Sequence, residues 1–226
     1  MKKAIIYDPY LDTAGGGERY CLTVAECLLA NDWQVDIFWD NKRDVDRVKN
    51  RLNLKIDKVN LINAKPHDLN TYQKMKLLSQ YNLSFWLSNG SLPLLTSKIN
   101  LVHFQRPFFD INGKGIQNKF KLMFIDSVVC NSKFTKKYID QEFGISSNVL
   151  YPPVDIDEFN SAEEKENIIL AVGRFDESGQ SKRQDILIKA FKQLIDEGLT
   201  DWRFVLIGGS LSKPKNNKFI QELKQQ

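Results

Sequence analysis

The fold is decided by four consecutive segments near the start of the chain: KAIIYD (residues 3–8), GGGER (15–19), YCLTVAECLLAND (20–32) and QVDIFWD (34–40). The first and the last are short apolar runs typical of strands. Between them, a glycine-rich loop leads into a segment that places Leu22, Ala25 and Leu29 on one helical face. Strand, glycine loop, helix and strand in this order predict a βαβ unit, and therefore an α/β fold with a parallel sheet.

The same alternation continues along the chain. Further strands are expected at 58–62, 84–89, 99–105 and 127–132, and helices at about 42–56, 115–124 and 133–143. Pro152 and Pro153 indicate an extended connection, because proline fits neither a helix interior nor a central strand. Beyond the charged run EEKE (163–166) the pattern restarts with a strand at 167–173, a helix at 184–198 and a strand at 202–209.

This restart predicts two domains, 1–163 and 164–226. The second has only two strands, and a parallel sheet needs more strands and helices on both faces. We therefore interpret 164–226 as the start of a larger α/β domain, and we expect the chain to be truncated at its C-terminus.

Composition indicates an ordinary globular protein. The 226 residues are 42% hydrophobic and 27% charged, and a net charge of +4 is too small to indicate nucleic-acid binding without a localised patch. No apolar run approaches the length of a secretory signal or a membrane span, so we expect a cytoplasmic protein. The cysteines Cys21, Cys27 and Cys130 form no CxxC pair, and no metal site is expected.

The GGGER loop is a candidate phosphate-binding turn, because a glycine-rich turn before a helix directs backbone N–H groups and the positive helix end at an anion. Its spacing matches neither GxGxxG nor a Walker loop, so a plain tight turn is an equal alternative. Asp40 ends the second predicted strand, where a dinucleotide enzyme places its ribose-binding acid. An NAD-type oxidoreductase domain is therefore an alternative function.

Two further candidate sites follow predicted strands. Arg174 comes directly after the 167–173 strand, and Lys182 and Arg183 begin the next helix. Cations at the carboxyl end of a parallel strand, beside a helix N-terminus, suit a diphosphate, although a solvated loop is the alternative. His103 follows the apolar run INLV and is either a contact to a sugar or phosphate or a buried histidine at the end of a strand.

Taken in order, several motifs carry a resemblance to a known family. They are GGGER (15–19), VHFQRP (102–107), VVCNSKFTKKYI (128–139), VLYPPVDIDEF (149–159), VGRF (172–175), KRQDILIKAF (182–191) and FVLIGG (204–209). Together they resemble glycosyltransferase family 4, retaining enzymes of the GT-B fold, over essentially the whole chain. The GGGER, NSKFT and YPPVD elements are most similar to mannosyltransferases that build lipid-linked oligosaccharide.

The resemblance implies two Rossmann-like domains, with the nucleotide-sugar donor bound mainly by the second. It implies that Arg174 and Lys182 bind the donor diphosphate, with Arg183 as a substitute for Lys182. Gly16 and Gly17 would approach the diphosphate and the sugar, and His103 would contact the donor sugar near the reaction centre. Gly208 and Gly209 would approach the nucleoside.

The implied reaction is transfer of a sugar from a nucleotide sugar, such as GDP-mannose or a UDP-sugar, to an acceptor hydroxyl with retention at the anomeric carbon. Fixed cations and helix N-termini would stabilise the diphosphate leaving group, so no metal cofactor is expected. The family's later segment with two glutamates has no counterpart here. We therefore expect the chain alone to be inactive, and a non-catalytic nucleotide-binding module is the alternative.

The placement of positive charge suggests which kind of acceptor the protein contacts. Six lysines lie within 24 residues and alternate with aromatic residues: Lys114, Lys119, Lys121, Lys133, Lys136 and Lys137, with Phe108, Phe109, Phe120 and Phe124. Such a surface could contact anionic lipid headgroups at the inner face of a membrane, which suits a lipid-linked or glycan acceptor. A solvated helix face is an equal alternative, and we expect no nucleic-acid partner.

Overall fold

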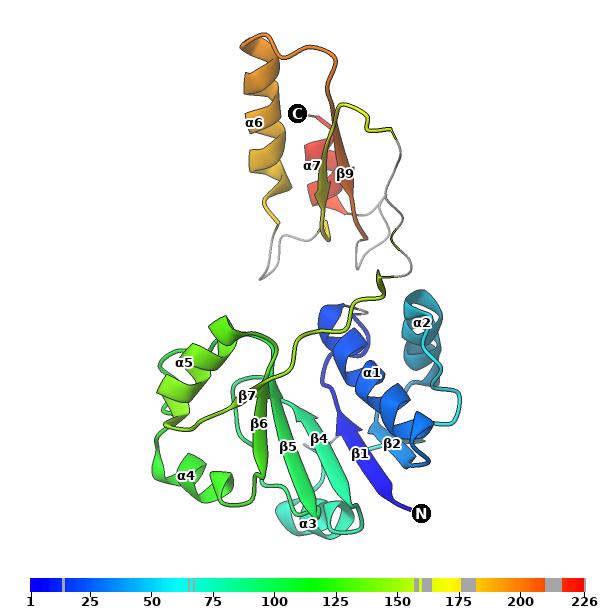
Figure 1. Cartoon of the computed structure of the whole chain (residues 1–226), viewed down its shortest axis with the longest axis vertical. Helices are drawn as coiled ribbons and strands as arrows, with labels where there is room; N and C mark the ends of the chain where they lie inside the picture. The colour runs from blue at the N-terminus through cyan, green and yellow to red at the C-terminus, as the bar shows by residue number, and fades with distance from the viewer. Residues whose placement is uncertain are drawn as a thin grey trace. The chain divides into compact units, whose positions relative to one another are not determined.

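The computed structural model describes residues 1–13, 15–64, 66, 68–156, 159, 164–175, 182–209 and 217–225. The chain divides into two compact units, an N-terminal unit (Met1–Asp155) and a C-terminal unit (Ile156–Gln226), which are described separately (Figure 1). No helix among the described residues is long and apolar enough to cross a membrane.

The described residues of the N-terminal unit form one sheet of seven parallel strands, in the order β3-β2-β1-β4-β5-β6-β7. The bounds of these strands are β1 Lys3–Tyr7, β2 Gln34–Phe38, β3 Asn60–Ile62, β4 Leu83–Leu87, β5 Ile99–Phe104, β6 Ser127–Cys130 and β7 Asn148–Val149. The direction in which strands are added reverses between β1 and β4. In open α/β sheets, ligands bind at the carboxyl ends of the strands beside such a reversal.

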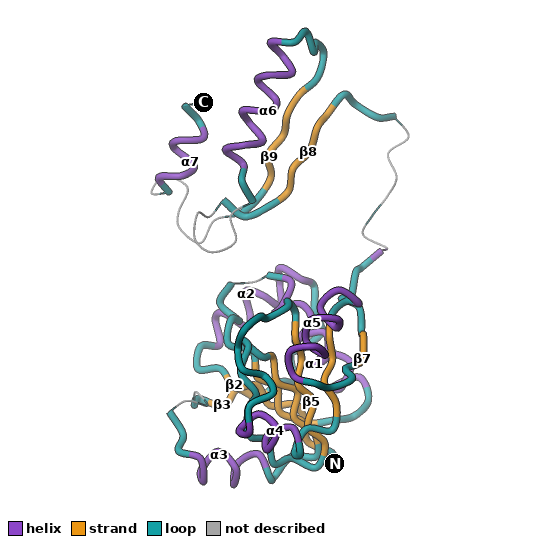
Figure 2. The backbone as a smooth tube through the Cα atoms, turned by 90° about the vertical axis from the view of Figure 1, so that its left-hand side faces the viewer, coloured by secondary structure: helices purple, strands orange, loops and turns teal. Residues whose placement is uncertain are grey.

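Helices cover both faces of this sheet (Figure 2). Their bounds are α1 Gly16–Ala30, α2 Lys42–Leu52, α3 Thr71–Leu78, α4 Ile116–Leu122 and α5 Lys133–Phe143. One core lies under α1 and α2 and includes Leu22 and Val48. A second core, which includes Leu78 and Ile139, lies under α3 and α5 on the opposite face. This arrangement follows from right-handed crossovers, which place α1 and α2 on one face and the later helices on the other.

The ends of α5 follow the sequence signals that predict them. Ser132 Oγ accepts a hydrogen bond from the backbone N–H of Thr135 at 3.1 Å and caps the start of the helix. Gly144 ends the helix in the left-handed conformation, with φ of +67°. Both caps satisfy backbone groups that have no partner within the helix.

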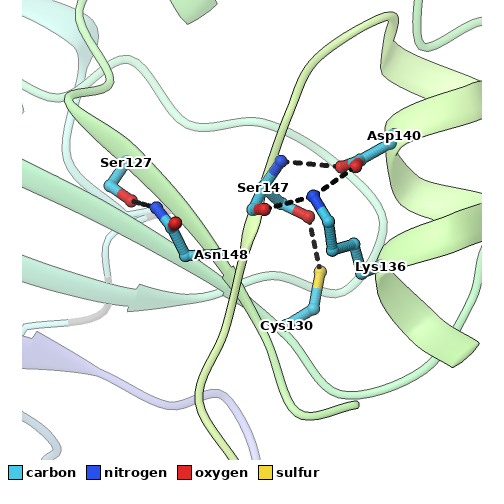
Figure 3. A network of polar contacts seen from close by, with 6 residues as sticks. All are labelled: Ser127, Cys130, Lys136, Asp140, Ser147 and Asn148. Carbon is cyan, nitrogen blue, oxygen red and sulfur yellow. Dashed lines mark hydrogen bonds and ion pairs between the residues drawn. The ribbon is translucent and has the colours of Figure 1, made fainter. Parts of the chain in front are cut away.

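A polar network then fastens α5 to the edge of the sheet (Figure 3). The ammonium of Lys136 lies 2.6 Å from Asp140 Oδ2 and also donates to the carbonyl oxygen of Ser147. The backbone N–H of Ser147 donates to Asp140 Oδ1 at 2.8 Å, and Cys130 Sγ lies 3.4 Å from Ser147 Oγ. Although partial burial acts in the opposite direction, the hydrogen bonds from Lys136 and Ser147 hold the pKa of the Asp140 carboxyl below its usual value.

In the C-terminal unit, the described residues form a parallel pair of strands and two helices. Their bounds are β8 Ile168–Val172, α6 Gln184–Asp196, β9 Arg203–Ile207 and α7 Lys218–Leu223. Apolar side chains of both strands stay accessible, since Leu170 is 54% exposed and Ile207 is 52% exposed. The α/β fold class predicted from the alternating pattern is confirmed.

Candidate functional site

Polar side chains gather at the carboxyl edge of the N-terminal sheet. Asp8 follows β1, Gln105 follows β5 and Asn131 follows β6. The side-chain Nδ2 of Asn131 donates to the carbonyl oxygen of Gln105 at 2.7 Å. A Cβ added at Gly17 would lie 2.9 Å from Gln105 Oε1, whereas a Cβ at Gly16 would meet no described atom within 4 Å. The fold therefore brings the predicted glycine loop against the end of β5.

The glycine loop begins α1, so its backbone N–H groups lie at the positive end of a 15-residue helix. A carboxylate already lies at this end, because Glu18 Oε2 accepts a hydrogen bond from the backbone N–H of Gly15. Glu18 is 3% exposed. Any phosphate that approaches the loop must therefore share the helix end with a buried carboxylate, which the glycine spacing alone did not indicate.

Asp8 is a second buried acid at this edge, and sequence reasoning missed it. Its carboxyl is 0% exposed, and Oδ1 accepts from the backbone N–H of Tyr10 at 2.8 Å. Oδ2 forms no hydrogen bond of ordinary geometry among the described residues, although the Cys21 thiol is near enough to lower the pKa of the carboxyl slightly. Burial, with a smaller contribution from Glu18, raises the pKa of this carboxyl to about 7. An acid directly after the first strand was the available sequence signal. The site thus holds a carboxyl that can gain or lose a proton near neutral pH.

The imidazole of His103 lies inside the unit, not at its surface. It is 0% exposed and stacks on the ring of Tyr20, with 4.0 Å between ring centroids. Nδ1 lies 3.0 Å from the carbonyl oxygen of Val129, and Nε2 has no partner among the described residues. Burial lowers the pKa of His103 to about 4, so the ring is neutral at pH 7.

Tyr20 closes this position from the α1 side. Its hydroxyl donates to the carbonyl oxygen of Leu150 at 3.0 Å, which links α1 to the segment after β7. Because the ring is fully buried, a donor sugar could reach His103 only after neighbouring side chains had moved. The role of His103 as a sugar contact therefore stays a prediction.

In the C-terminal unit, the predicted cations lie at the carboxyl end of β8. Arg174, Lys182 and Arg183 are all exposed. Lys182 lines a cavity of about 170 Å³ together with Gly173, Phe175 and Gln184. The side chain of Gln184, which sequence reasoning also missed, donates from Nε2 to the carbonyl oxygen of Arg174 at 2.9 Å. This hydrogen bond holds the start of α6 against the end of β8.

The two neighbouring cations differ in their surroundings. The guanidinium of Arg183 forms two hydrogen bonds with the carboxylate of Asp185, Nε to Oδ1 and Nη2 to Oδ2, each at 3.1 Å. This contact lowers the pKa of the Asp185 carboxyl. The stem of Lys182, in contrast, packs over Gly173, where an added Cβ would lie 2.6 Å from Lys182 Cγ. Lys182 is thus the cation that borders the cavity, and Arg183 is held by its own helix.

Gly208 and Gly209, the other predicted positions, follow β9. A Cβ at Gly208 would lie 1.8 Å from the carbonyl oxygen of Gly173, so only glycine fits there. No described atom lies within 4 Å of a Cβ placed at Gly209. Gly208 therefore has a packing role, whatever ligand the unit binds.

The alternative ribose acid, Asp40, borders a different cavity from any that the glycine loop lines. Asp40 lines a cavity of about 610 Å³ formed with α2 and β3, and no glycine of residues 15–17 lines that cavity. Among the described residues, no group of three or more histidine, cysteine or acidic side chains could hold a metal ion.

Of the comparisons with known proteins, the one with solved structures found matches. No protein-family model and no curated protein matches the chain. A UDP-N-acetylglucosamine 2-epimerase from Neisseria meningitidis, solved with UDP-GlcNAc, superposes with a TM-score of 0.52 at 12% identity over 100% of this chain and 70% of its own. A Listeria monocytogenes protein assigned as the same type of epimerase gives 0.52 at 9% identity, with 100% and 66% covered.

An alpha-glucosyltransferase in complex with UDP and DNA also superposes, with a TM-score of 0.50 at 11% identity over 100% of this chain and 59% of its own. The chain thus spans about two thirds of the length of these proteins. Identities this low establish the fold alone. The neighbours are GT-B-like nucleotide-sugar proteins, and the predicted GT-B-type fold with a Rossmann-like N-terminal sheet is confirmed.

Proposed function

We propose that this chain belongs to a retaining glycosyltransferase that moves a sugar, with mannose as the first candidate, from a nucleoside diphosphate sugar to a hydroxyl of a glycan or lipid-linked acceptor. The observation that carries the proposal is the pair of cations at the end of β8. Arg174 follows the strand, and Lys182 borders the cavity at the start of α6. The ordered family-4 motifs and the GT-B-type fold support it.

In this proposal, residues 164–226 bind the donor and residues 1–163 carry the acceptor side. Breaking the glycosidic bond leaves negative charge on the diphosphate. Lys182 and Arg174 stabilise that charge as fixed cations, which favours the transition state over the ground state. Lys182 has the primary role, because the guanidinium of Arg183 is already held by Asp185. In the glycine loop, Gly16 is the position beside which no described atom would meet an added Cβ.

A nucleotide-sugar epimerase is the second candidate, because two of the compared structures are 2-epimerases, one of them solved with UDP-GlcNAc. Both functions use the same kind of donor. They differ in the product, since a transferase needs an acceptor and an epimerase changes the donor alone.

One assay separates these candidates. Radiolabelled GDP-mannose, UDP-glucose and UDP-GlcNAc are each incubated with the whole enzyme to which this chain is proposed to belong, with and without a polyprenyl-diphosphate-linked sugar acceptor. The 226-residue chain alone is assayed in parallel and is expected to give no product. We expect label to enter the lipid fraction only when the acceptor is present. Conversion of UDP-GlcNAc into its 2-epimer without acceptor would favour the epimerase. Binding of donors with neither product would favour the non-catalytic nucleotide-binding module.

The cation assignment makes a separate prediction for binding. Lys182→Ala and Arg174→Ala should each weaken affinity for a nucleoside diphosphate about 10- to 100-fold, because each loses a charge-assisted contact of about 1.5–3 kcal/mol. Arg183→Ala is the matched control and should change affinity less than about threefold. Calorimetric titration with GDP and UDP measures all three. Unchanged affinity in both the Lys182 and the Arg174 variants would contradict the assignment.

A further inference from the structure

Helix α4 and the turn that follows it expose large apolar side chains to solvent. Four large hydrophobic side chains are exposed: Ile116 by 85%, Phe120 by 54%, Met123 by 81% and Phe124 by 37%. No residue of α4 is buried. Single exposed hydrophobic residues are common on soluble proteins, but neighbouring ones in one patch mark an interaction surface.

Ile116 and Phe120 lie one turn apart on α4, and Met123 and Phe124 lie in the turn that directly follows the helix. These four neighbouring exposed side chains are called the stripe. The rings of Phe120 and Phe124 contact each other edge to face, with 5.2 Å between centroids. The inner side of the same segment is occupied by Leu122 and Ile125, which pack against the core under α3 and α5. The stripe is therefore additional to the side chains that hold α4 on the sheet.

Positive charge flanks the stripe. On α4, at 100° per residue, Lys119 lies to one side of Ile116 and Phe120 and Lys121 lies to the other. The charge of Lys121 also reaches Lys74 of α3, where partial burial and then Lys121 lower the pKa of the Lys74 ammonium. Residues 111–126 contain three lysines and one acid, Asp126, so the segment carries net positive charge. Asp126 Oδ2 already accepts a hydrogen bond from the backbone N–H of Asn100.

Two of the residues that the sequence suggested for contact with lipid headgroups are already engaged within the fold. Lys136 is held by Asp140 and Ser147, and the ring of Phe108 lies against Gly90, so neither is available for a partner. The four apolar side chains of the stripe and Lys119 are exposed, and Lys121 is half-buried.

We propose that α4 is a membrane-contact helix, whose outward stripe inserts at the surface of an anionic phospholipid bilayer with Lys119 and Lys121 beside the phosphates. An apolar face between lysines has the chemistry of an interfacial helix, and charge complementarity selects anionic headgroups. α4 ends just before β6 begins, at the amino end of the sheet and opposite the glycine loop (Figures 1 and 2). This binding is independent of the donor site, so each can fail without the other.

The test is co-sedimentation of the 226-residue chain with vesicles. We expect binding to vesicles of phosphatidylcholine and phosphatidylglycerol in a 7:3 ratio, and at least about tenfold weaker binding to phosphatidylcholine alone. Raising the salt concentration should weaken the binding to anionic vesicles. Equal binding to both vesicles, or none to either, would overturn the proposal.

Two double variants locate the surface. Phe120→Ser/Met123→Ser and Lys119→Glu/Lys121→Glu should each weaken binding to anionic vesicles about tenfold or more. Ile195→Ser, which changes a 51% exposed residue of α6, is the matched control and should bind as the unaltered chain does. Circular dichroism and nucleotide affinity should stay unchanged in all variants, which shows that the fold and the donor site are intact.

Two other results would overturn the proposal. Either both double variants still bind anionic vesicles as the unaltered chain does, or the stripe pairs with a second copy. The latter would appear in light scattering as a dimer that Phe120→Ser/Met123→Ser dissociates.

Discussion

Replacing Gly208 with alanine is expected to destabilise the C-terminal unit by about 3 kcal/mol or more. The new Cβ would lie 1.8 Å from the carbonyl oxygen of Gly173, and this neighbour is backbone, which cannot rotate away as a side chain can. The backbone N–H of Gly173 donates to Ile207 at 2.8 Å, and that of Phe175 donates to Gly209 at 2.9 Å. To make room for the new Cβ, the segments after β8 and β9 must move apart. This movement breaks these hydrogen bonds and disturbs the packing between the two strands, which gives the expected loss of about 3 kcal/mol.

Gly209→Ala is the matched control for this variant. A Cβ there meets no described atom within 4 Å, so stability should change by less than about 0.5 kcal/mol. Hydrogen exchange followed by mass spectrometry measures both variants. Peptides from β8 and β9 should lose protection in Gly208→Ala only, and peptides from β1 and β5 should keep theirs. Equal protection of β8 and β9 in both variants would contradict the steric argument.

Removing the charge of Asp8 is expected to abolish a loss of stability that the N-terminal unit undergoes as pH rises from about 4 to about 7. The pKa of this carboxyl is raised to about 7 in the folded protein, so the folded state holds its proton more tightly than the unfolded state does. Stability from this group is complete below the unfolded pKa near 4 and is lost as pH rises towards 7. Because one pKa unit corresponds to about 1.4 kcal/mol, the loss can reach about 4 kcal/mol.

Asp8→Asn keeps an oxygen for the hydrogen bond from Tyr10 but carries no charge. We therefore expect this variant to be more stable than the unaltered chain at pH 8, with the difference narrowing as pH falls and closing near pH 4. Urea unfolding at several pH values measures this difference, and Asp32→Asn, which changes an exposed acid just after α1, is the control. A difference that does not change with pH would show that Asp8 does not carry the shifted proton.

Local patterns in the sequence were sufficient for the strands and helices that carry strong periodicity. The run at 3–8, the helix after the glycine loop and the capped helix from Ser132 to Gly144 each combine a regular apolar pattern with a start or stop signal. Patterning missed α3 and β7. β7 has two residues, which is too few to reveal a period. α3 has eight residues, but Leu78 is its one buried residue, so the helix has almost no apolar face.

The sequence by itself determined the α/β class, the order of the strands along the chain and the positions of the glycine loop and of the basic loop after β8, because these depend on neighbouring residues. Only the tertiary structure decided what surrounds each side chain. It buried His103 under Tyr20, paired Arg183 with Asp185 and left Lys182 at the cavity. It also buried Asp8 and left apolar side chains of α4 exposed to solvent. Burial and pairing depend on segments far apart in the chain, so no local pattern reports them.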